Sequence, residues 1–305
     1  MATVACIGEC MIELRELPDG RLARSWGGDT LNTAVYLARL GTPVDYLTAL
    51  GDDPWSGEML AGWQAEGVGT ARVPRLPGRL PGLYVIQTDA AGERRFSYWR
   101  GEAPARQLFD LPGTPALAAA LPGYALLYLS GVSLSLYGVA GRERLLAALA
   151  QARAGGSRVA FDTNFRLRGW RDLEEARAAF RRAIAAADIV LASREDLEPL
   201  FGPEPPPELA GAGLELVLKR PDQTCRVTAP GADLVVAAAP VARVVDTTAA
   251  GDSFAAAYLA TRLAGGDPAA AAVAGHRLAG AVVGHRGAVI PRAAMPTDLG
   301  PRVAP

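Results

Sequence analysis

Short apolar runs alternate with helix-forming segments along most of the chain, and this alternation restricts the fold more than any other feature. The first run spans residues 3–9. Later runs lie at 44–50, 125–130, 158–162, 188–192 and 214–219, with helical segments at 31–40, 54–66, 142–153, 173–187 and 254–263. Continuous apolar runs are typical of parallel strands buried on both faces. We therefore predict an α/β fold, in which helices flank a mostly parallel central sheet and ligands bind at the carboxyl ends of its strands.

One segment interrupts this alternation. Residues 83–88 and 93–99 are two alternating runs around a turn at 89–92, which predicts an antiparallel hairpin. The preceding residues 72–82 are rich in Pro, Gly and Arg, as in a hinge or loop. We expect a single domain over residues 1–305, with a small β-sheet lid formed by about 9–26 and 80–102. Exposed edges of a lid can pair with a second copy, so a homo-oligomer through the lid is expected.

The charge and composition argue against several classes of partner. The formal net charge is −1 and no long basic run is present, so nucleic acid is not an expected partner. No apolar run approaches the length that spans a membrane. Cys6, Cys10 and Cys225 form no CxxC pair, which predicts free thiols in a reducing, cytoplasmic compartment. His276 and His285 lack the partners of a metal site or a Ser-His-Asp triad.

The segment 244–254 carries the strongest chemical signal. It reads as a strand end, a turn of small residues and the start of a helix. Nothing larger than a methyl group projects from Ala249, Ala250 or Gly251, so their backbone N–H groups can approach an anion, at which the helix dipole also points. A carboxylate at Asp252, in front of such a site, suits a base that deprotonates a hydroxyl beside a phosphate. The alternative is that Asp252 only caps the helix.

Two motifs resemble the signatures of one enzyme family. The turn Asp246–Asp252 resembles the carboxyl-terminal signature of the ribokinase-like (PfkB) sugar kinases, and Gly27–Ala34 looks like their amino-terminal one. Further segments are similar to the bacterial 2-keto-3-deoxygluconate kinases; they are 7–14, 80–84, 97–100, 162–166 and 287–292. The resemblance covers essentially the whole chain. It implies a ribokinase-like fold and ATP-dependent phosphorylation of a keto-sugar acid to its 6-phosphate.

The resemblance also implies the roles of individual residues. Asp252 would be the catalytic base, and the N–H groups of Ala249, Ala250 and Gly251 would hold the transferring phosphoryl group. The substrate-binding residues would be Gly28, Asp29, Asn32, Tyr84, Tyr98, Arg100 and Arg166. A sugar acid needs a cation for its carboxylate, and arginine offers a planar fork of two donors. The alternatives are that Asp29 and Asn32 cap a helix and that both arginines are solvated surface residues.

The nucleotide side departs from the family pattern in two places. The resemblance implies ATP and Mg²⁺ as cofactors and leaves a monovalent cation open. The nucleotide-binding set would be Asn164, Ser193, Lys219, Arg220, Thr224, Thr248, Gly251, Ala279 and Val283. Ser193 and Asp196 stand where family members usually have Asn and Glu, so Asp196 would hold the metal through water. After the strand that ends at Lys219, family members usually have Gly, whereas this chain has Arg220 and Pro221. Proline lacks the backbone N–H that could otherwise point at a phosphate, and Lys219, Arg220 and Thr224 could compensate for it.

Three competing functions lead to different expectations. A kinase for a neutral sugar such as fructose or ribose would not need the pair Arg100 and Arg166. A non-catalytic sensor on the same fold would lack Asp252 or the anion-binding turn. A Rossmann oxidoreductase needs a glycine fingerprint after the first strand, and Gly8–Met11 does not match it.

Overall fold

The computed structural model describes residues 4–17, 19–88 and 94–299. The strands of its main sheet are β1 (Val4–Ile7), β4 (Val44–Leu47), β6 (Val68–Gly69), β10 (Leu126–Ser130), β11 (Arg158–Asp162), β12 (Ile189–Ser193), β13 (Glu215–Lys219), β14 (Thr224–Ala229) and β15 (Ala232–Ala237). Their order across the sheet is β15-β14-β13-β12-β11-β10-β1-β4-β6. All pairs from β6 to β13 are parallel, and β14 and β15 add an antiparallel edge. The predicted α/β fold with a mostly parallel sheet is confirmed.

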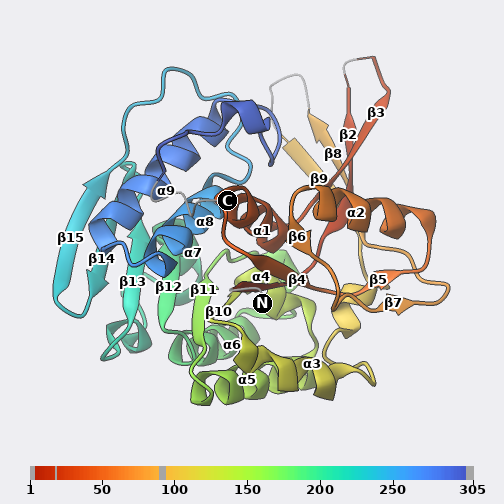
Figure 1. Ribbon diagram of the computed structural model, residues 1–305, viewed down its shortest axis with the longest axis horizontal. Coiled ribbons are helices and arrows are strands. Elements are labelled where there is room, and N and C mark those ends of the chain that lie inside the picture. Colours follow the sequence, from red (N-terminus) through yellow and green to blue (C-terminus); the bar gives the residue numbers. More distant parts are fainter. Residues whose placement is uncertain (1–3, 18, 89–93, 300–305) are drawn as a thin grey trace.

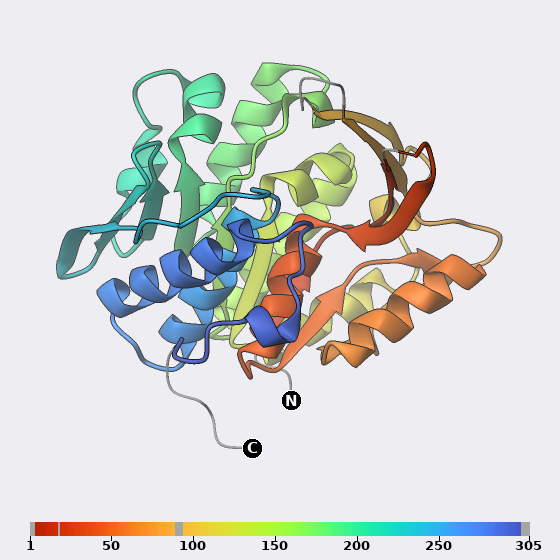
Figure 2. The ribbon, with the colours of Figure 1, turned by 90° about the horizontal axis from the view of Figure 1, so that it is seen from above.

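Helices cover both faces of this sheet (Figures 1 and 2). The helices of one face are α1 (Asp29–Arg39), α2 (Pro54–Ala65), α8 (Ala250–Leu263) and α9 (Pro268–Val283). Those of the other face are α3 (Thr114–Ala120), α4 (Gly131–Leu136), α5 (Val139–Ala154), α6 (Leu173–Ala185) and α7 (Arg194–Phe201). Each face of the sheet packs against its helices in a hydrophobic core. Alternate residues of β1 point into these two cores: Val4 and Cys6 into the first, and Ala5 and Ile7 into the second. This two-sided burial explains the continuous apolar runs of the sequence.

A small second sheet projects from the body beside α2 (Figure 1). Its strands are β2 (Met11–Glu16), β3 (Leu22–Gly27), β8 (Leu83–Thr88) and β9 (Arg94–Trp99), in the order β3-β2-β8-β9. β8 and β9 are antiparallel, as the hairpin prediction requires, and the predicted turn at 89–92 lies outside the described residues. A short parallel pair, β5 (Leu50–Gly51) and β7 (Arg75–Leu76), lies apart from both sheets.

The helix starts test the predicted caps. Asp267 caps α9 by accepting from the Ala270 N–H at 2.7 Å, and Pro268 is the first residue of that helix, a position that suits proline because its missing N–H would have no partner there. The alternative that Asp29 only caps the first helix is wrong, since α1 begins at Asp29 and its N-cap is Gly28, in extended conformation. Among the described residues, no helix is both long and apolar enough to cross a membrane.

Candidate active site

The turn between β15 and α8 is tethered by hydrogen bonds on both sides. The Val245 N–H donates to the Val283 carbonyl of α9 at 2.7 Å. The Asp246 carboxylate accepts from the Thr248 N–H at 2.9 Å, from the Thr248 hydroxyl at 2.7 Å and from the Gly287 N–H at 3.0 Å. The Thr248 hydroxyl, predicted to meet nucleotide, therefore also holds the shape of the turn.

The first turn of α8 carries the predicted anion-binding backbone. Its N-cap, Ala249, has a φ of 61°, a left-handed conformation that costs energy in a residue with a Cβ and that clusters at functional sites. The Ala250 N–H donates to the Thr247 carbonyl at 3.2 Å, so one of the three predicted N–H donors already has a partner. Because Ala249 is the N-cap and α8 has no side-chain cap bond, the alternative that Asp252 merely caps the helix is wrong.

Asp252 faces the start of α1. The Asn32 side-chain amide donates to the Asp252 carboxylate at 2.8 Å. Asp29 lies in the same turn of α1 and accepts from the side-chain amide of Asn164, just beyond β11, at 2.6 Å. Burial raises the pKa of Asp252 well above its usual range; the Asp29 charge adds to this, whereas the Asn32 hydrogen bond and Lys219 lower it. The fold thus brings together four predicted site residues and leaves Asp252 a stronger base than an ordinary aspartate.

Lys219, the last residue of β13, supplies a positive charge beside the turn. Its ammonium lies 3.7 Å from the carboxylate of Asp162, the last residue of β11. A Cβ placed on Gly251 would be 3.5 Å from the same ammonium, so Lys219 borders the predicted anion site. Burial raises the pKa of Asp162 to about 6, and Lys219 partly opposes this shift. Sequence reasoning assigned no role to Asp162, although it stands at the end of a predicted strand.

The lid tyrosines share one face of the small sheet. Tyr84 is paired with both Glu13 and Tyr98 across the strands, and the two tyrosine rings are 5.8 Å apart. The Tyr84 hydroxyl donates to Glu13, which also accepts from the Ser25 hydroxyl at 2.9 Å. Trp99, the neighbour of Tyr98, lies on the opposite face and is 62% exposed. Glu13 was missed because the parallel pairing of β2 with β8 cannot be read from the sequence.

Arg100 has a protein partner that the sequence did not indicate. Its guanidinium forms an ion pair with Glu9, which follows β1 and is only 4% exposed. Arg166, in contrast, is open to solvent: its side chain is 64% exposed, lies 3.5 Å from Asp196 and donates to the Phe165 carbonyl at 2.7 Å. Of the two arginines predicted to bind the substrate carboxylate, Arg100 is held by a buried protein carboxylate, whereas Arg166 is accessible from solvent.

Asp196 is held inside the loops around β11 and β12. Its two carboxylate oxygens accept from the Thr163 hydroxyl at 2.9 Å and from the Phe165 N–H at 3.1 Å, and its N–H donates to the hydroxyl of Ser193, the N-cap of α7. Within residues 4–17, 19–88 and 94–299, no three His, Cys, Asp or Glu side chains are arranged to bind a metal directly. The donor set fits a water-mediated ion better than direct coordination.

The remaining predicted nucleotide residues lie in the turn between β13 and β14 and on α9. The Thr224 hydroxyl donates to Asp222 at 2.7 Å, and the Arg220 N–H donates to the Thr224 carbonyl at 2.9 Å, so both residues belong to the turn around Pro221. Ala279 and Val283 are partly buried on α9. Thr224 is therefore less free to bind phosphate than the sequence suggested.

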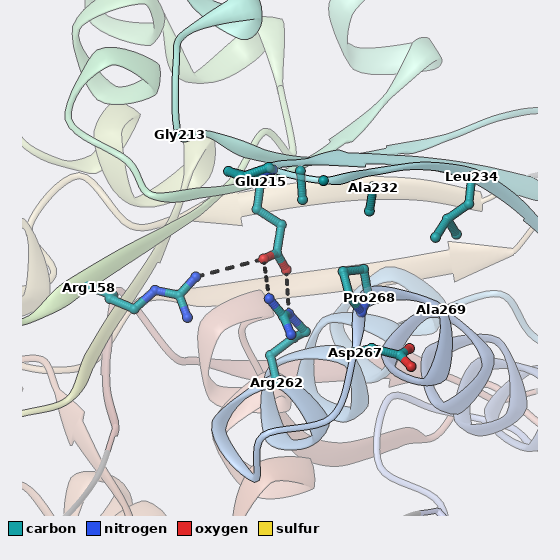
Figure 3. Close-up of a pocket in the computed structure, with 12 residues that line it drawn as sticks. Arg158, Gly213, Glu215, Ala232, Leu234, Arg262, Asp267, Pro268 and Ala269 are labelled. Carbon is teal, nitrogen blue, oxygen red and sulfur yellow. Dashed lines mark hydrogen bonds and ion pairs between the residues drawn. The ribbon is translucent and has the colours of Figure 1, made fainter.

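A cavity of about 580 Å³ lies at the other end of the main sheet (Figure 3). Arg158 and Glu215 line it and begin the strands β11 and β13, whose other ends carry Asp162 and Lys219. Glu215 is buried and accepts two hydrogen bonds from Arg262, at 2.8 and 2.7 Å. This cavity is separate from the candidate active site, and its buried carboxylate is already neutralised.

An enzyme that passes a phosphoryl group to a hydroxyl needs a base, an anion-binding helix start and a cation at one place. The carboxyl edge of this sheet gathers a candidate for each of the three: Asp252, the start of α8 and Lys219. The model of the "pfkB family carbohydrate kinase" family matches residues 1–295, and the chain belongs to that family. It is an ATP-dependent carbohydrate kinase.

Curated relatives and solved structures agree with the family. The chain is 47% identical to a 2-dehydro-3-deoxygluconokinase of Dickeya dadantii, with 96% of this chain and 98% of the relative covered. It is 30% identical to a fructokinase of Salmonella typhimurium, over 88% of this chain and 86% of the relative. The crystal structure of a 2-dehydro-3-deoxygluconokinase from Thermotoga maritima has the same fold, with a TM-score of 0.81, 22% identity and coverage of 95% of this chain and 94% of that one.

Proposed function

We propose that this protein phosphorylates 2-keto-3-deoxygluconate (2-dehydro-3-deoxygluconate) with ATP to the 6-phosphate, as a step in sugar-acid catabolism. The observation that carries the proposal is the 47% identity, over nearly the full length, to a protein named for that activity. A neutral sugar such as fructose or ribose is the second candidate, because a fructokinase is related at 30% identity. Arg100 and Arg166 favour the acid, since its carboxylate calls for a cation with a two-donor fork.

In the proposed reaction Asp252 takes the proton of the acceptor hydroxyl while that oxygen attacks the terminal phosphorus of ATP. The bond from this phosphorus to the bridging oxygen breaks, and ADP leaves with that oxygen. The raised pKa of Asp252 makes it a better proton acceptor near neutral pH than an unperturbed carboxylate. The N–H groups of Ala249, Ala250 and Gly251 would stabilise the transferring charge, with Lys219 beside them. The Ala250 N–H contributes once it leaves the Thr247 carbonyl.

The acceptor would bind between the start of α1 and the lid. Gly28, Asp29 and Asn32 would meet its hydroxyls, and Tyr84 and Tyr98 would cover it from above. Closure of the lid excludes water, which otherwise competes for the phosphoryl group.

ATP would lie along β13 and α9. The proposed nucleotide-binding residues are Asn164, Ser193, Lys219, Arg220, Thr224, Thr248, Gly251, Ala279 and Val283. Magnesium, when bound, offsets the negative charge of the phosphates, and Asp196 would orient its water shell. Activity assays with and without a monovalent cation would test whether the reaction depends on one.

We also propose a cytoplasmic homo-oligomer that associates through the lid. The support for the location is three buried, unpaired thiols, Cys6, Cys10 and Cys225. The support for the interface is the exposure of Trp99, which is 62% exposed on the face of the lid sheet opposite the tyrosines.

A panel of acceptors tests the function. The purified protein is given ATP, magnesium and one of four acceptors: the gluconate-derived keto-acid, its galactonate-derived epimer, fructose or ribose. ADP release is measured, and phosphorus NMR locates the new phosphate. We expect the highest kcat/KM with the gluconate-derived acid and a 6-phosphate product. A higher kcat/KM with fructose or ribose would replace the proposal with the neutral-sugar alternative.

A further inference from the structure

Glu9 is a buried carboxylate that the proposed reaction does not use. It lies two residues after the end of β1, its side chain is 1% exposed, and it pairs with Arg100, the residue after β9. In the described part of the chain, neither Glu9 oxygen has a hydrogen-bond partner of normal geometry, and the same holds for Nε and Nη2 of Arg100. The contact is therefore an ion pair with little else to satisfy either charge.

Burial of a carboxylate without a partner is strongly unfavourable, so Arg100 is what permits a charge at this position. Loss of hydration raises the pKa of Glu9; the charges of Arg100 and Arg106 lower it, and that of Asp29 raises it. A charge pair in such a place is sensitive to geometry, because water cannot replace a lost partner.

Glu9 also lies where three parts of the acceptor region meet. A Cβ placed on Gly82, just before β8, would be 3.0 Å from a Glu9 oxygen and 3.1 Å from the Cβ of Arg100. A Cβ on Gly28, the N-cap of α1, would be 2.2 Å from the Glu9 backbone oxygen. Both glycines thus permit a close approach to Glu9. The Glu9 side chain thus lies against Gly82 and Arg100, the residues at the two roots of the β8–β9 hairpin. The Glu9 backbone lies against the loop before Asp29.

We propose that Glu9 is a positioning residue for acceptor binding: its carboxylate fixes Arg100 and both roots of the β8–β9 hairpin relative to the Gly28 loop. It does not touch the reacting atoms. The proposal rests on the proposed function only in placing the acceptor between the lid and α1.

The lid offers a matched control for the test. Arg24 of β3 pairs with Glu58 of α2 at 2.7 Å, and this second lid-to-body ion pair is largely exposed, with side-chain exposures of 40% and 53%. Exposed ion pairs contribute little, because solvent screens them. Glu9→Gln and Glu58→Gln therefore make the same chemical change at a buried and an exposed anchor of one lid.

The experiment measures KM for the acceptor and for ATP in the wild type and both variants, with the acceptor on which the wild type is most active. This choice keeps the test valid whichever sugar the panel identifies. Glu9→Gln should raise the acceptor KM roughly tenfold or more, leave the ATP KM within about twofold, and speed hydrogen exchange at Leu83 and Trp99. Glu58→Gln should match the wild type. Glu9→Asp keeps the charge and should fall between them, and it serves alone if Glu9→Gln does not fold.

Three results would overturn the proposal. Equal KM values in Glu9→Gln and Glu58→Gln would show that the buried pair has no influence on the acceptor. A parallel rise of both KM values would indicate a general structural role. A fall in the acceptor KM would mean that Glu9 competes with the acceptor for Arg100.

Discussion

The side-chain amide of Asn32 donates a 2.8 Å hydrogen bond to the carboxylate of Asp252, 220 positions later in the chain. The bond joins the first turn of α1 to the first turn of α8, and so connects the proposed acceptor-binding residues to the proposed base. It also favours the charged form of Asp252, since an N–H donor stabilises a carboxylate. The strength of the base therefore depends on a residue from the other end of the sequence.

Replacing Asn32 should change the pH dependence of the reaction. A general base must be deprotonated, so kcat/KM falls as the pH drops through its pKa. Burial and Asp29 raise the pKa of Asp252, and the Asn32 bond opposes them. In Asn32→Ala the acidic limb of kcat/KM should move to higher pH, in addition to any loss of acceptor affinity. An unmoved limb would show that another group controls it.

Asp252→Asn should keep the fold and nucleotide binding but reduce kcat by roughly a hundredfold or more, the range for loss of a general base. The amide preserves the shape and can still bond Asn32 through its oxygen. Asp267→Asn is the matched control, because Asp267 also lies at a helix start and only caps it. Near-normal kcat in folded Asp252→Asn would disprove the base assignment.

Arg166→Ala should impair use of the keto-acid far more than use of a neutral sugar. Losing a hydrogen bond to a charged group typically costs about 1.5–3 kcal/mol, which is about ten- to a hundredfold in kcat/KM. The control is Arg168→Ala, an exposed arginine two residues further on. Equal losses on both acceptors would assign Arg166 to the phosphates.

Arg100→Ala should likewise impair use of the keto-acid more than use of a neutral sugar. It should also lower the stability of the fold, because Glu9 is left buried and unpaired.

Asp162 should make the folded protein less stable as the pH rises towards neutrality. Its pKa is raised by burial from 3.8 to about 6, so the folded state holds a proton that the unfolded chain has released. This contribution is complete below about pH 4 and is lost between about pH 4 and 6. The free energy of unfolding of the wild type, relative to Asp162→Asn, should therefore fall by about 2 kcal/mol from pH 4 to 7. Urea titrations of both proteins across this range measure it; a constant difference would contradict the raised pKa.

The sequence predicted the fold because periodicity and turn residues are local signals. It placed Asp252, Asn32 and Lys219 at strand or helix ends, and parallel strands bring such ends to one edge. It did not predict the Glu9–Arg100 pair or the contact of Glu13 with Tyr84, since both depend on which lid strands become neighbours. Nor did it indicate that both Asp196 oxygens already accept hydrogen bonds from Thr163 and Phe165. Contacts between side chains on different elements depend on which strands pair and in which register, and neither composition nor residue spacing encodes this.

The β8–β9 hairpin should close over the acceptor as a lid. It belongs to a sheet separate from the main one, follows the Pro- and Gly-rich segment 72–82, and carries Tyr84 and Tyr98 on one face. The proposed base and anion site lie at the start of α8, outside the small sheet, so closure should respond to the acceptor and little to ATP. Hydrogen exchange with ATP alone, with acceptor alone and with neither tests this. Amides of β8 and β9 should gain protection on addition of the acceptor, and those near Gly251 on addition of ATP. If the hairpin amides stay unchanged while those near Gly28 respond to the acceptor, the hairpin is a fixed part of the molecule and does not close.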